Sequence, residues 1–116
     1  MHTLTKSLLA FLLAAAVLFA AGPGFRSKRQ YDDHFAKHGA EFGKITKEQY
    51  LQMAQEMRDA PKSAEILEIV RQDRVITRFH RGKGWFLAFN RDKTIRTFFI
   101  PNDGERYFRR QARTSH

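Results

Sequence analysis

The fold is decided by residues 66–100, which read ILEIVRQDRVITRFHRGKGWFLAFNRDKTIRTFFI. β-branched and aromatic residues recur in this stretch with a period of two, which is the spacing expected of strands. Polar segments of hairpin length interrupt the pattern three times. The stretch therefore predicts an antiparallel meander of four strands, at residues 66–71, 74–81, 85–89 and 94–100.

Two helical patterns precede the predicted strands. The first covers residues 31–38, places aromatic side chains on one face, and ends at Gly39, a residue type that commonly follows a helix. The second begins at Thr46, which caps the helix, and ends before Pro61. Segments of this kind predict an α+β fold in which N-terminal helices pack on the four-stranded meander. Tyr107 is expected in a final strand or helical turn.

The N-terminus has the layout of an export signal. An apolar run over residues 8–21 follows a basic residue and is broken by Gly-Pro-Gly at 22–24. Residues 1–24 are therefore expected to form a signal peptide, with an uncleaved membrane anchor or a buried core helix as the alternatives. A basic linker at 25–30 and a domain at 31–116 follow. A secreted, periplasmic or membrane-anchored protein is expected.

The chain is strongly basic and contains no cysteine. Its 116 residues include 21 basic and 12 acidic side chains, for a formal charge of +9. Residues 31–70 carry five basic and eight acidic side chains, whereas residues 71–116 carry twelve basic and four acidic ones. The second half is therefore expected to face a polyanion. The absence of cysteine excludes disulfides, cysteine-ligated metals and thiol nucleophiles.

His34 and His38 are four residues apart, so both imidazoles are expected on one face of the first helix. Three interpretations of this pair stay open. The two residues are polar side chains with a structural role, or they are metal ligands completed by Glu41 or His80, or they form an acid–base pair. The zinc-protease motif His-Glu-x-x-His has a catalytic glutamate between its histidines, and this sequence, His-Phe-Ala-Lys-His, has none.

An acid–base pair suits the cleavage of RNA. The ribose 2′-OH must lose a proton, the 5′-oxygen must gain one, and the charge on the phosphorane must be stabilised. Two imidazoles and an arginine meet these demands without a metal ion. We expect His34 and His38 to be base and acid in an undetermined order, with Arg78, or Arg96 as the alternative, at the phosphorane. Thr97 and Tyr107 are expected to position the phosphate, and Lys37, Arg81 and Arg96 to bind the substrate.

Two blocks of residues carry a resemblance to a known family. Residues 34–43 read HFAKHGAEFG and residues 95–101 read IRTFFIP. Their order, with Tyr50 between them and Tyr107 after them, is similar to C-terminal toxin domains of polymorphic and contact-dependent growth-inhibition systems. Those domains belong to the barnase/EndoU/colicin/RelE-like (BECR) superfamily of ribonucleases.

The resemblance covers about residues 31–111 and implies a function. It implies a toxin-like endoribonuclease without cofactor or metal ion that cleaves RNA, often tRNA, to a 2′,3′-cyclic phosphate. It also implies an acidic immunity protein as a partner, and a monomer is expected. The alternative is a non-catalytic exported basic module that binds nucleic acid or another polyanion. The polar positions of the family fall on His34, His38, Arg78, Arg96, Thr97 and Tyr107.

Overall fold

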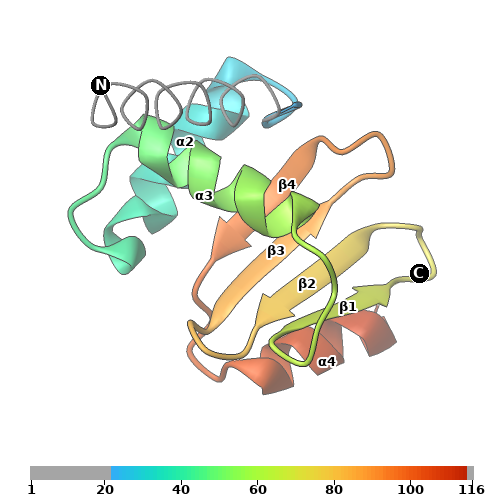
Figure 1. Ribbon diagram of the computed structural model, residues 1–116. Helices are drawn as coiled ribbons and strands as arrows, with labels where there is room; N and C mark the ends of the chain where they lie inside the picture. The colour runs from blue at the N-terminus through green and yellow to red at the C-terminus, as the bar shows by residue number, and fades with distance from the viewer. Residues whose placement is uncertain (1–21, 115–116) are drawn as a thin grey trace, which may run out of the picture.

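The computed structural model describes residues 22–114 and has the predicted α+β architecture (Figure 1). In this part of the chain, three α-helices and a short 3₁₀ turn accompany a four-stranded antiparallel sheet. Residues 1–21, which hold most of the expected signal peptide or membrane anchor, lie outside the described residues. The elements are α2 (Lys28–His38), η1 (Gly39–Phe42), α3 (Lys47–Asp59), β1 (Ile66–Val70), β2 (Ile76–His80), β3 (Trp85–Phe89), β4 (Ile95–Phe99) and α4 (Glu105–Thr114).

The sheet is a meander in which each strand pairs with the next one along the chain. The strand order is β1-β2-β3-β4, and all three pairings are antiparallel. The four predicted strands are confirmed, each within two residues of its expected ends. Arg74, Gly84 and Lys93 have φ angles of 71°, 73° and 75° in the three hairpin turns. Tight reversals between strands require such left-handed backbone.

A β-bulge near the start of β4 changes which side chains face the helices. Thr97 and Ile95 lie opposite consecutive residues of β3, so Arg96 is an extra residue in β4. Ile95 is therefore buried on the same side of the sheet as Phe98, while Thr97 and Phe99 lie on the other side. The bulge leaves Arg96 exposed at the edge of the sheet.

Helices cover both faces of the sheet (Figure 1). α2 and α3 pack on one face, where Tyr50 and Phe98 are fully buried. α4 packs on the other face, where Phe108 contacts a second core that includes Phe79 and Phe86. The segment after Pro101, expected as a strand or a helical turn, is thus a helix of ten residues. The strands are apolar on both faces, so the apolar side chains of this helix cover the face that α2 and α3 leave open.

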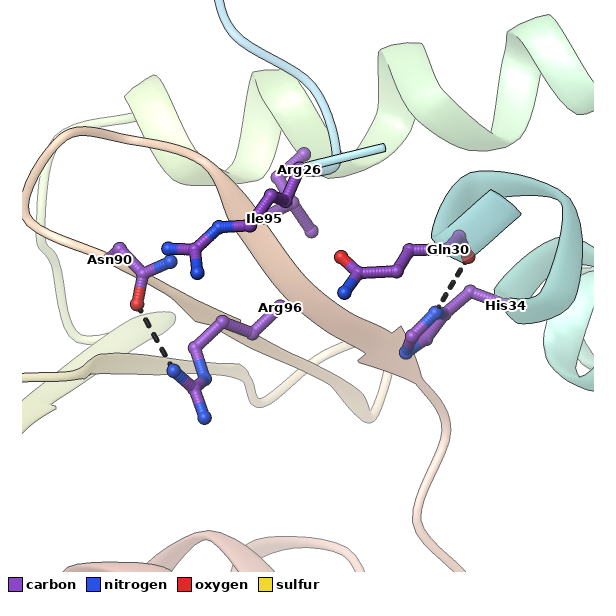
Figure 2. Close-up of a pocket in the computed structure, with 6 residues that line it drawn as sticks. All are labelled: Arg26, Gln30, His34, Asn90, Ile95 and Arg96. Atoms are coloured by element: carbon purple, nitrogen blue, oxygen red, sulfur yellow. Dashed lines mark hydrogen bonds between the residues drawn. The ribbon is translucent and has the colours of Figure 1, made fainter. Parts of the chain in front are cut away.

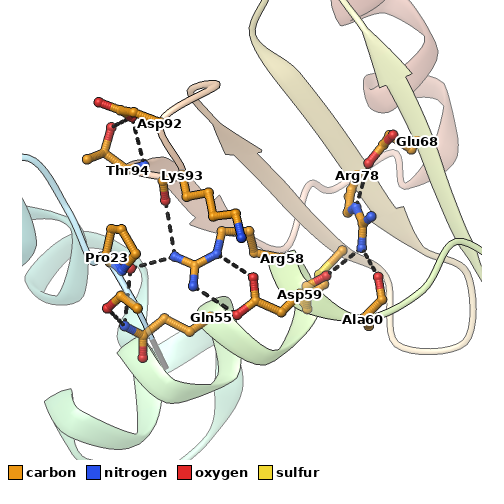
Figure 3. A network of polar contacts seen from close by, with 12 residues as sticks. Pro23, Gln55, Arg58, Asp59, Ala60, Glu68, Arg78, Asp92, Lys93 and Thr94 are labelled. Carbon is orange, nitrogen blue, oxygen red and sulfur yellow. Dashed lines mark hydrogen bonds and ion pairs between the residues drawn. The ribbon is translucent and has the colours of Figure 1, made fainter. Parts of the chain in front are cut away.

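The segment before α2 is bound to the rest of the fold. Phe25 forms a parallel bridge with Ile95 of β4. The buried guanidinium of Arg58 on α3 donates to the carbonyl oxygen of Pro23 (Figure 3). α2 begins at Lys28, three residues before its expected start, so part of the expected basic linker is helical. The residues that precede the first helix therefore belong to the packed structure.

Candidate active site

A hollow of about 420 Å³ lies between the C-terminal half of α2, the edge strand β4 and the start of α4. We call it the histidine hollow. Four of the five side chains that the sequence predicts to be catalytic line it, and so does one of the three predicted to bind substrate. These residues come from three separate parts of the chain, so the fold brings them together. The lining residues are Asp33, His34, Lys37, His38, Thr97, Phe99 and Tyr107.

α2 presents both imidazoles to the hollow because they are one turn apart. The helix is capped by the side chain of Ser27, which accepts a hydrogen bond of 3.1 Å from the backbone of Gln30. It ends at His38, as predicted. A Cβ atom at Gly39 would lie 2.5 Å from the ring of Phe35, so glycine is needed there for close packing. The φ of Gly39 is −54°, so left-handed backbone is not the reason.

The ring of His34 is held from two sides. Its Nδ1 lies 2.8 Å from the carbonyl oxygen of Gln30. Because a carbonyl oxygen only accepts, Nδ1 carries the hydrogen and Nε2 is left as the acceptor of the neutral ring. Phe25 stacks on the imidazole, with ring centroids 5.0 Å apart. The backbone of α2 and an aromatic ring thus fix both the tautomer and the orientation of His34.

His38 is held by a carboxylate. Its Nδ1 donates to Oε2 of Glu41 at 2.8 Å, and Oε1 of Glu41 accepts from the backbone nitrogen of Ile100, also at 2.8 Å. The ring packs against Phe99 with centroids 5.0 Å apart, and its centroid lies 6.2 Å from that of His34. The η1 turn makes this possible because it brings Glu41 back beside the end of α2.

Thr97 and Tyr107 bring two hydroxyl groups to the opposite wall of the hollow. The ring of Tyr107 is partly buried and packs edge-on against Phe86 and Phe99, at centroid distances of 4.9 and 5.2 Å. Burial raises the pKa of the Tyr107 phenol above its ordinary value of 10, so the group is a neutral donor at physiological pH. The β4 bulge turns Thr97 toward the same side as Tyr107.

A second, smaller hollow of about 270 Å³ shares His34 with the first (Figure 2). We call it the arginine hollow. Arg26 reaches it from the segment before α2, and Arg96 reaches it from the β4 bulge. Oδ1 of Asn90 accepts a hydrogen bond of 3.3 Å from the Arg96 guanidinium. The lining residues are Arg26, Gln30, His34, Asn90, Ile95 and Arg96.

Arg78 lies away from both hollows, on the side of the sheet that faces α3. Its guanidinium donates to Oε1 of Glu68 at 2.8 Å and to the carbonyl oxygens of Met57 and Ala60 at the end of α3 (Figure 3). The side chain is 9% exposed. The structure therefore does not bring Arg78 together with the histidine pair, where a group that stabilises the phosphorane would be needed. The Nε and Nη1 donors of the guanidinium are used within the protein itself.

Arg81 also lies outside the two hollows. It donates to Oε1 of Glu105 on α4 at 3.0 Å and more weakly to the carbonyl oxygen of Ala64. With Arg109, it holds the pKa of the Glu105 carboxyl at about 2. These contacts give Arg81 a role in holding α4 to the sheet. They do not bring it near the histidine pair.

No protein-family model matches this chain, and no curated protein matches it either. The expected membership of the BECR superfamily stays a prediction from the two sequence blocks. The function must therefore be argued from the two hollows themselves.

Neither a metal cluster nor a membrane span is found between residues 22 and 114. No three histidine, aspartate or glutamate side chains lie close enough together there to hold a metal ion. His80, one of the residues expected to complete a metal site, lines a different hollow beside α3. No helix in the same part of the chain has the length and apolar character needed to cross a bilayer.

Several side chains at the two hollows are not predicted from the sequence as parts of a phosphate-binding site. Glu41 is predicted from the sequence only as a possible metal ligand, although its position three residues after His38 is a signal for a hydrogen bond. Arg26 was assigned to a linker. Asn90 and Gln30 gave no signal, because their positions depend on the hairpin and on the way α2 lies against β4.

Proposed function

We propose that this protein is a metal-independent endoribonuclease that cleaves RNA by attack of the 2′-OH, leaving a 2′,3′-cyclic phosphate. One observation carries the proposal. Two imidazoles of fixed tautomer, His34 and His38, line one hollow together with two hydroxyl groups and an ammonium group. These are the groups that phosphodiester transesterification requires.

The reaction is balanced by two proton transfers. A base removes the proton of the 2′-OH, and the 2′-oxygen forms a bond to phosphorus. The bond from phosphorus to the 5′-oxygen breaks, and an acid protonates that oxygen. The products are a 2′,3′-cyclic phosphate and a free 5′-OH. The neutral base ends the step protonated and the acid ends it neutral, so the pair exchanges roles without any other reactant.

The partners of the two rings suggest their roles. Glu41 places a carboxylate at Nδ1 of His38, where it balances the positive charge of the protonated ring. His34 has only the neutral carbonyl of Gln30 at its Nδ1. We therefore assign His38 as the acid and His34 as the base. Glu41 is a positioning residue in this scheme because it touches His38 rather than the substrate.

Three further side chains of the hollow suit the phosphate. The carboxylate of Asp33 also lines the hollow, and its Oδ2 lies 3.9 Å from Nε of Arg29. The ammonium group of Lys37 supplies positive charge, since it forms no ion pair among the described residues. The hydroxyl groups of Thr97 and Tyr107 donate hydrogen bonds. Arg96 lies in the adjoining hollow, so it takes over part of the role that the sequence analysis gave to Arg78. Transition-state charge is stabilised best by donors that are already in place.

The test is cleavage of total RNA by the purified full chain in EDTA. The wild type should cleave, and mass spectrometry should find 2′,3′-cyclic phosphate ends. His34→Ala and His38→Ala should each lower the rate by about 10²–10⁴-fold. The matched control is His80→Ala, which removes an imidazole outside the hollow and should leave the rate unchanged. Intact RNA, or equal cleavage by the His34→Ala/His38→Ala double variant, would overturn the proposal.

The biological setting is proposed from the sequence blocks and the charge. It is that of an exported, monomeric, toxin-like enzyme that acts on RNA, preferably tRNA, and is blocked by an acidic immunity protein. Charge complementarity to the basic second half of the chain would speed the association. The check is whether a small acidic protein encoded next to this one binds the chain and stops RNA cleavage. A neutral or basic inhibitor would contradict the charge argument.

A second candidate function is supported by the free cations near the hollows. Arg26, Lys37 and Arg96 form no ion pair with any described residue. A non-catalytic module that binds a polyanion would also place such cations at its surface. Binding of RNA that weakens steeply with salt, without cleavage and without any effect of His34→Ala or His38→Ala, would favour this function over the enzyme.

A further inference from the structure

The arginine hollow is built from two guanidinium groups that the rest of the protein leaves available. Arg26 takes part in no hydrogen bond or ion pair within residues 22–114. Arg96 donates only to the neutral amide oxygen of Asn90. In contrast, Arg58 and Arg78 are buried and bound to carboxylates and backbone oxygens. The two kinds of arginine therefore have different functions, and those of the hollow are suited to an external anion.

Asn90 holds Arg96 in place without cancelling its charge. Its Nδ2 donates to Oγ1 of Thr94 at 2.9 Å, so its Oδ1 is left to accept from Arg96. Arg26 acts electrostatically on one acidic side chain, Asp92, whose pKa it helps to lower. The carboxylate of Asp92 already accepts two hydrogen bonds from Thr94. Arg96 has an acidic neighbour in Asp73, whose pKa it helps to lower, but the Asp73 carboxylate is bound by Arg71 at 2.6 Å. Both carboxylates have partners of their own, so the hollow keeps a net positive charge. A guanidinium fixed in this way loses little side-chain freedom when an anion binds.

The position of the hollow determines which anion fits. His34 lines both hollows, and Figure 2 shows its place in the arginine hollow. Because the two hollows share His34, an RNA strand with one phosphate between His34 and His38 can continue past His34 into the arginine hollow. If His34 is the base, it lies on the side of the nucleotide that supplies the 2′-OH. The next phosphate on that side is the one 5′ to this nucleotide.

We propose that Arg26 and Arg96 form a binding subsite for the RNA phosphate immediately 5′ to the nucleotide whose 2′-OH attacks. This inference rests on the proposed ribonuclease function. Gln30, which also lines the hollow, offers a neutral amide to the same phosphate or its ribose. The subsite makes the enzyme prefer strands with a phosphate on the 5′ side, which an isolated dinucleoside phosphate lacks.

The experiment compares three substrates for the full chain: UpA, pUpA and UpAp. The wild type should cleave pUpA with a kcat/KM about tenfold higher than that for UpA, the effect of one or two exposed charge-assisted hydrogen bonds. UpAp should show no such advantage. In Arg26→Gln/Arg96→Gln the ratio of pUpA to UpA should fall to about one. In Lys62→Gln, which removes a cation near Glu68 on the far strand β1, the ratio should stay as in the wild type.

A binding measurement separates the failure of this inference from the failure of the proposed function. The same three dinucleotides with 2′-deoxyuridine have no nucleophile and report binding alone. For the wild type, the slope of log affinity against log salt should be steeper for the 5′-phosphorylated ligand by about 0.7. Arg26→Gln/Arg96→Gln should lose this difference. Equal slopes in wild type and variant, or an advantage for the 3′-phosphate alone, overturn the subsite even if RNA is cleaved. If the salt slopes are as expected but no RNA is cleaved, the proposed ribonuclease function is overturned. Arg26 and Arg96 then form an anion-binding site without catalysis.

Discussion

Phe25 stacks on the imidazole of His34, with ring centroids 5.0 Å apart and planes inclined by 30°. The same ring stacks on Tyr31 and Tyr50 at 5.7 and 6.3 Å. Phe25 also forms the bridge to Ile95 at the start of β4. One side chain therefore connects the segment before α2, the core and the candidate base.

The first prediction concerns Phe25→Ala. Because Phe25 is partly buried, its loss should lower the free energy of unfolding by about 2–3 kcal/mol. The His34 ring also loses its stacking partner, so kcat/KM for RNA should fall about tenfold. Urea unfolding and initial cleavage rates measure the two effects. Phe25→Leu, which keeps most of the volume, should recover stability more than activity. Equal recovery of both would show that Phe25 does not orient His34.

The second prediction concerns Glu41→Gln. The substitution removes the carboxylate that holds Nδ1 of His38. It weakens the hydrogen bond from Ile100 and so costs about 1 kcal/mol of stability. The cleavage rate should fall by about 10-fold or more. The control is Glu48→Gln, which removes one negative charge from the exposed surface of α3.

A direct readout is available for this positioning role. Nitrogen-15 NMR of the histidine rings should show the Nδ1–H tautomer of His38 in the wild type and its partial loss in Glu41→Gln. The pH profile of the cleavage rate should change in Glu41→Gln and stay as in the wild type in Glu48→Gln. A variant with an unchanged tautomer and profile would leave Glu41 with a structural role only.

The third prediction concerns the two hydroxyl groups of the histidine hollow. Thr97→Val and Tyr107→Phe keep the shape of the side chain and remove one donor each. Each should lower kcat about tenfold, the worth of one hydrogen bond to a charged group. Thr77→Val is the control, because the buried Thr77 hydroxyl donates to the carbonyl of Ile69 at 2.8 Å. It should lose about 1 kcal/mol of stability and keep its kcat.

The fourth prediction concerns Arg78→Met. Removing the guanidinium leaves Glu68 and the carbonyl oxygens at the end of α3 without their donor. Loss of one partner of a largely buried ion pair should cost about 3 kcal/mol. At a temperature where the variant is folded, its kcat should match that of the wild type. Unfolding in urea and single-turnover cleavage test the two parts. Normal stability with lost cleavage would return Arg78 to the catalytic set.

The fifth prediction concerns acid stability. Arg81 and Arg109 hold the pKa of Glu105 at about 2, below its ordinary value of 4.5. A carboxyl whose pKa is lower in the folded state stabilises the fold above its unfolded pKa and loses this effect as the pH falls. The contribution of Glu105 should therefore decline between pH 4.5 and 2. Thermal unfolding should depend less on pH in this window for Glu105→Gln than for the wild type. Parallel curves would contradict the assignment.

The local parts of the fold were predictable from the sequence. The strands were found from period-two patterns because each strand is defined by its own residues. The end of α2 at His38 and the Thr46–Gln49 capping box were found for the same reason. The helix start was missed by three residues, because the capping role of Ser27 was not considered.

The site was predictable only in part. His34, Lys37 and His38 share one helix, so their spacing alone places them together. Thr97 and Tyr107 were named as hydroxyl donors to the phosphate and also match positions of the family resemblance, and the bulge and α4 bring them to the same hollow. Arg78 shows the limit of such reasoning. A strand arginine has the same appearance in a sequence whether its guanidinium is free or bound to Glu68 across the β1–β2 pair.

The sequence by itself determined the four strands, the end of α2, the capped start of α3 and the helix face that carries both histidines, since these depend on neighbours a few residues apart. Only the tertiary structure decided which cations are available to a substrate. That property depends on what each guanidinium meets across the fold: Arg78 meets Glu68 and the end of α3, whereas Arg26 and Arg96 meet at an open hollow beside His34. Contacts between residues that are far apart in the chain produce no pattern in the spacing of neighbouring residues. The pairing of Arg26 with Arg96 therefore appears only when the chain is folded.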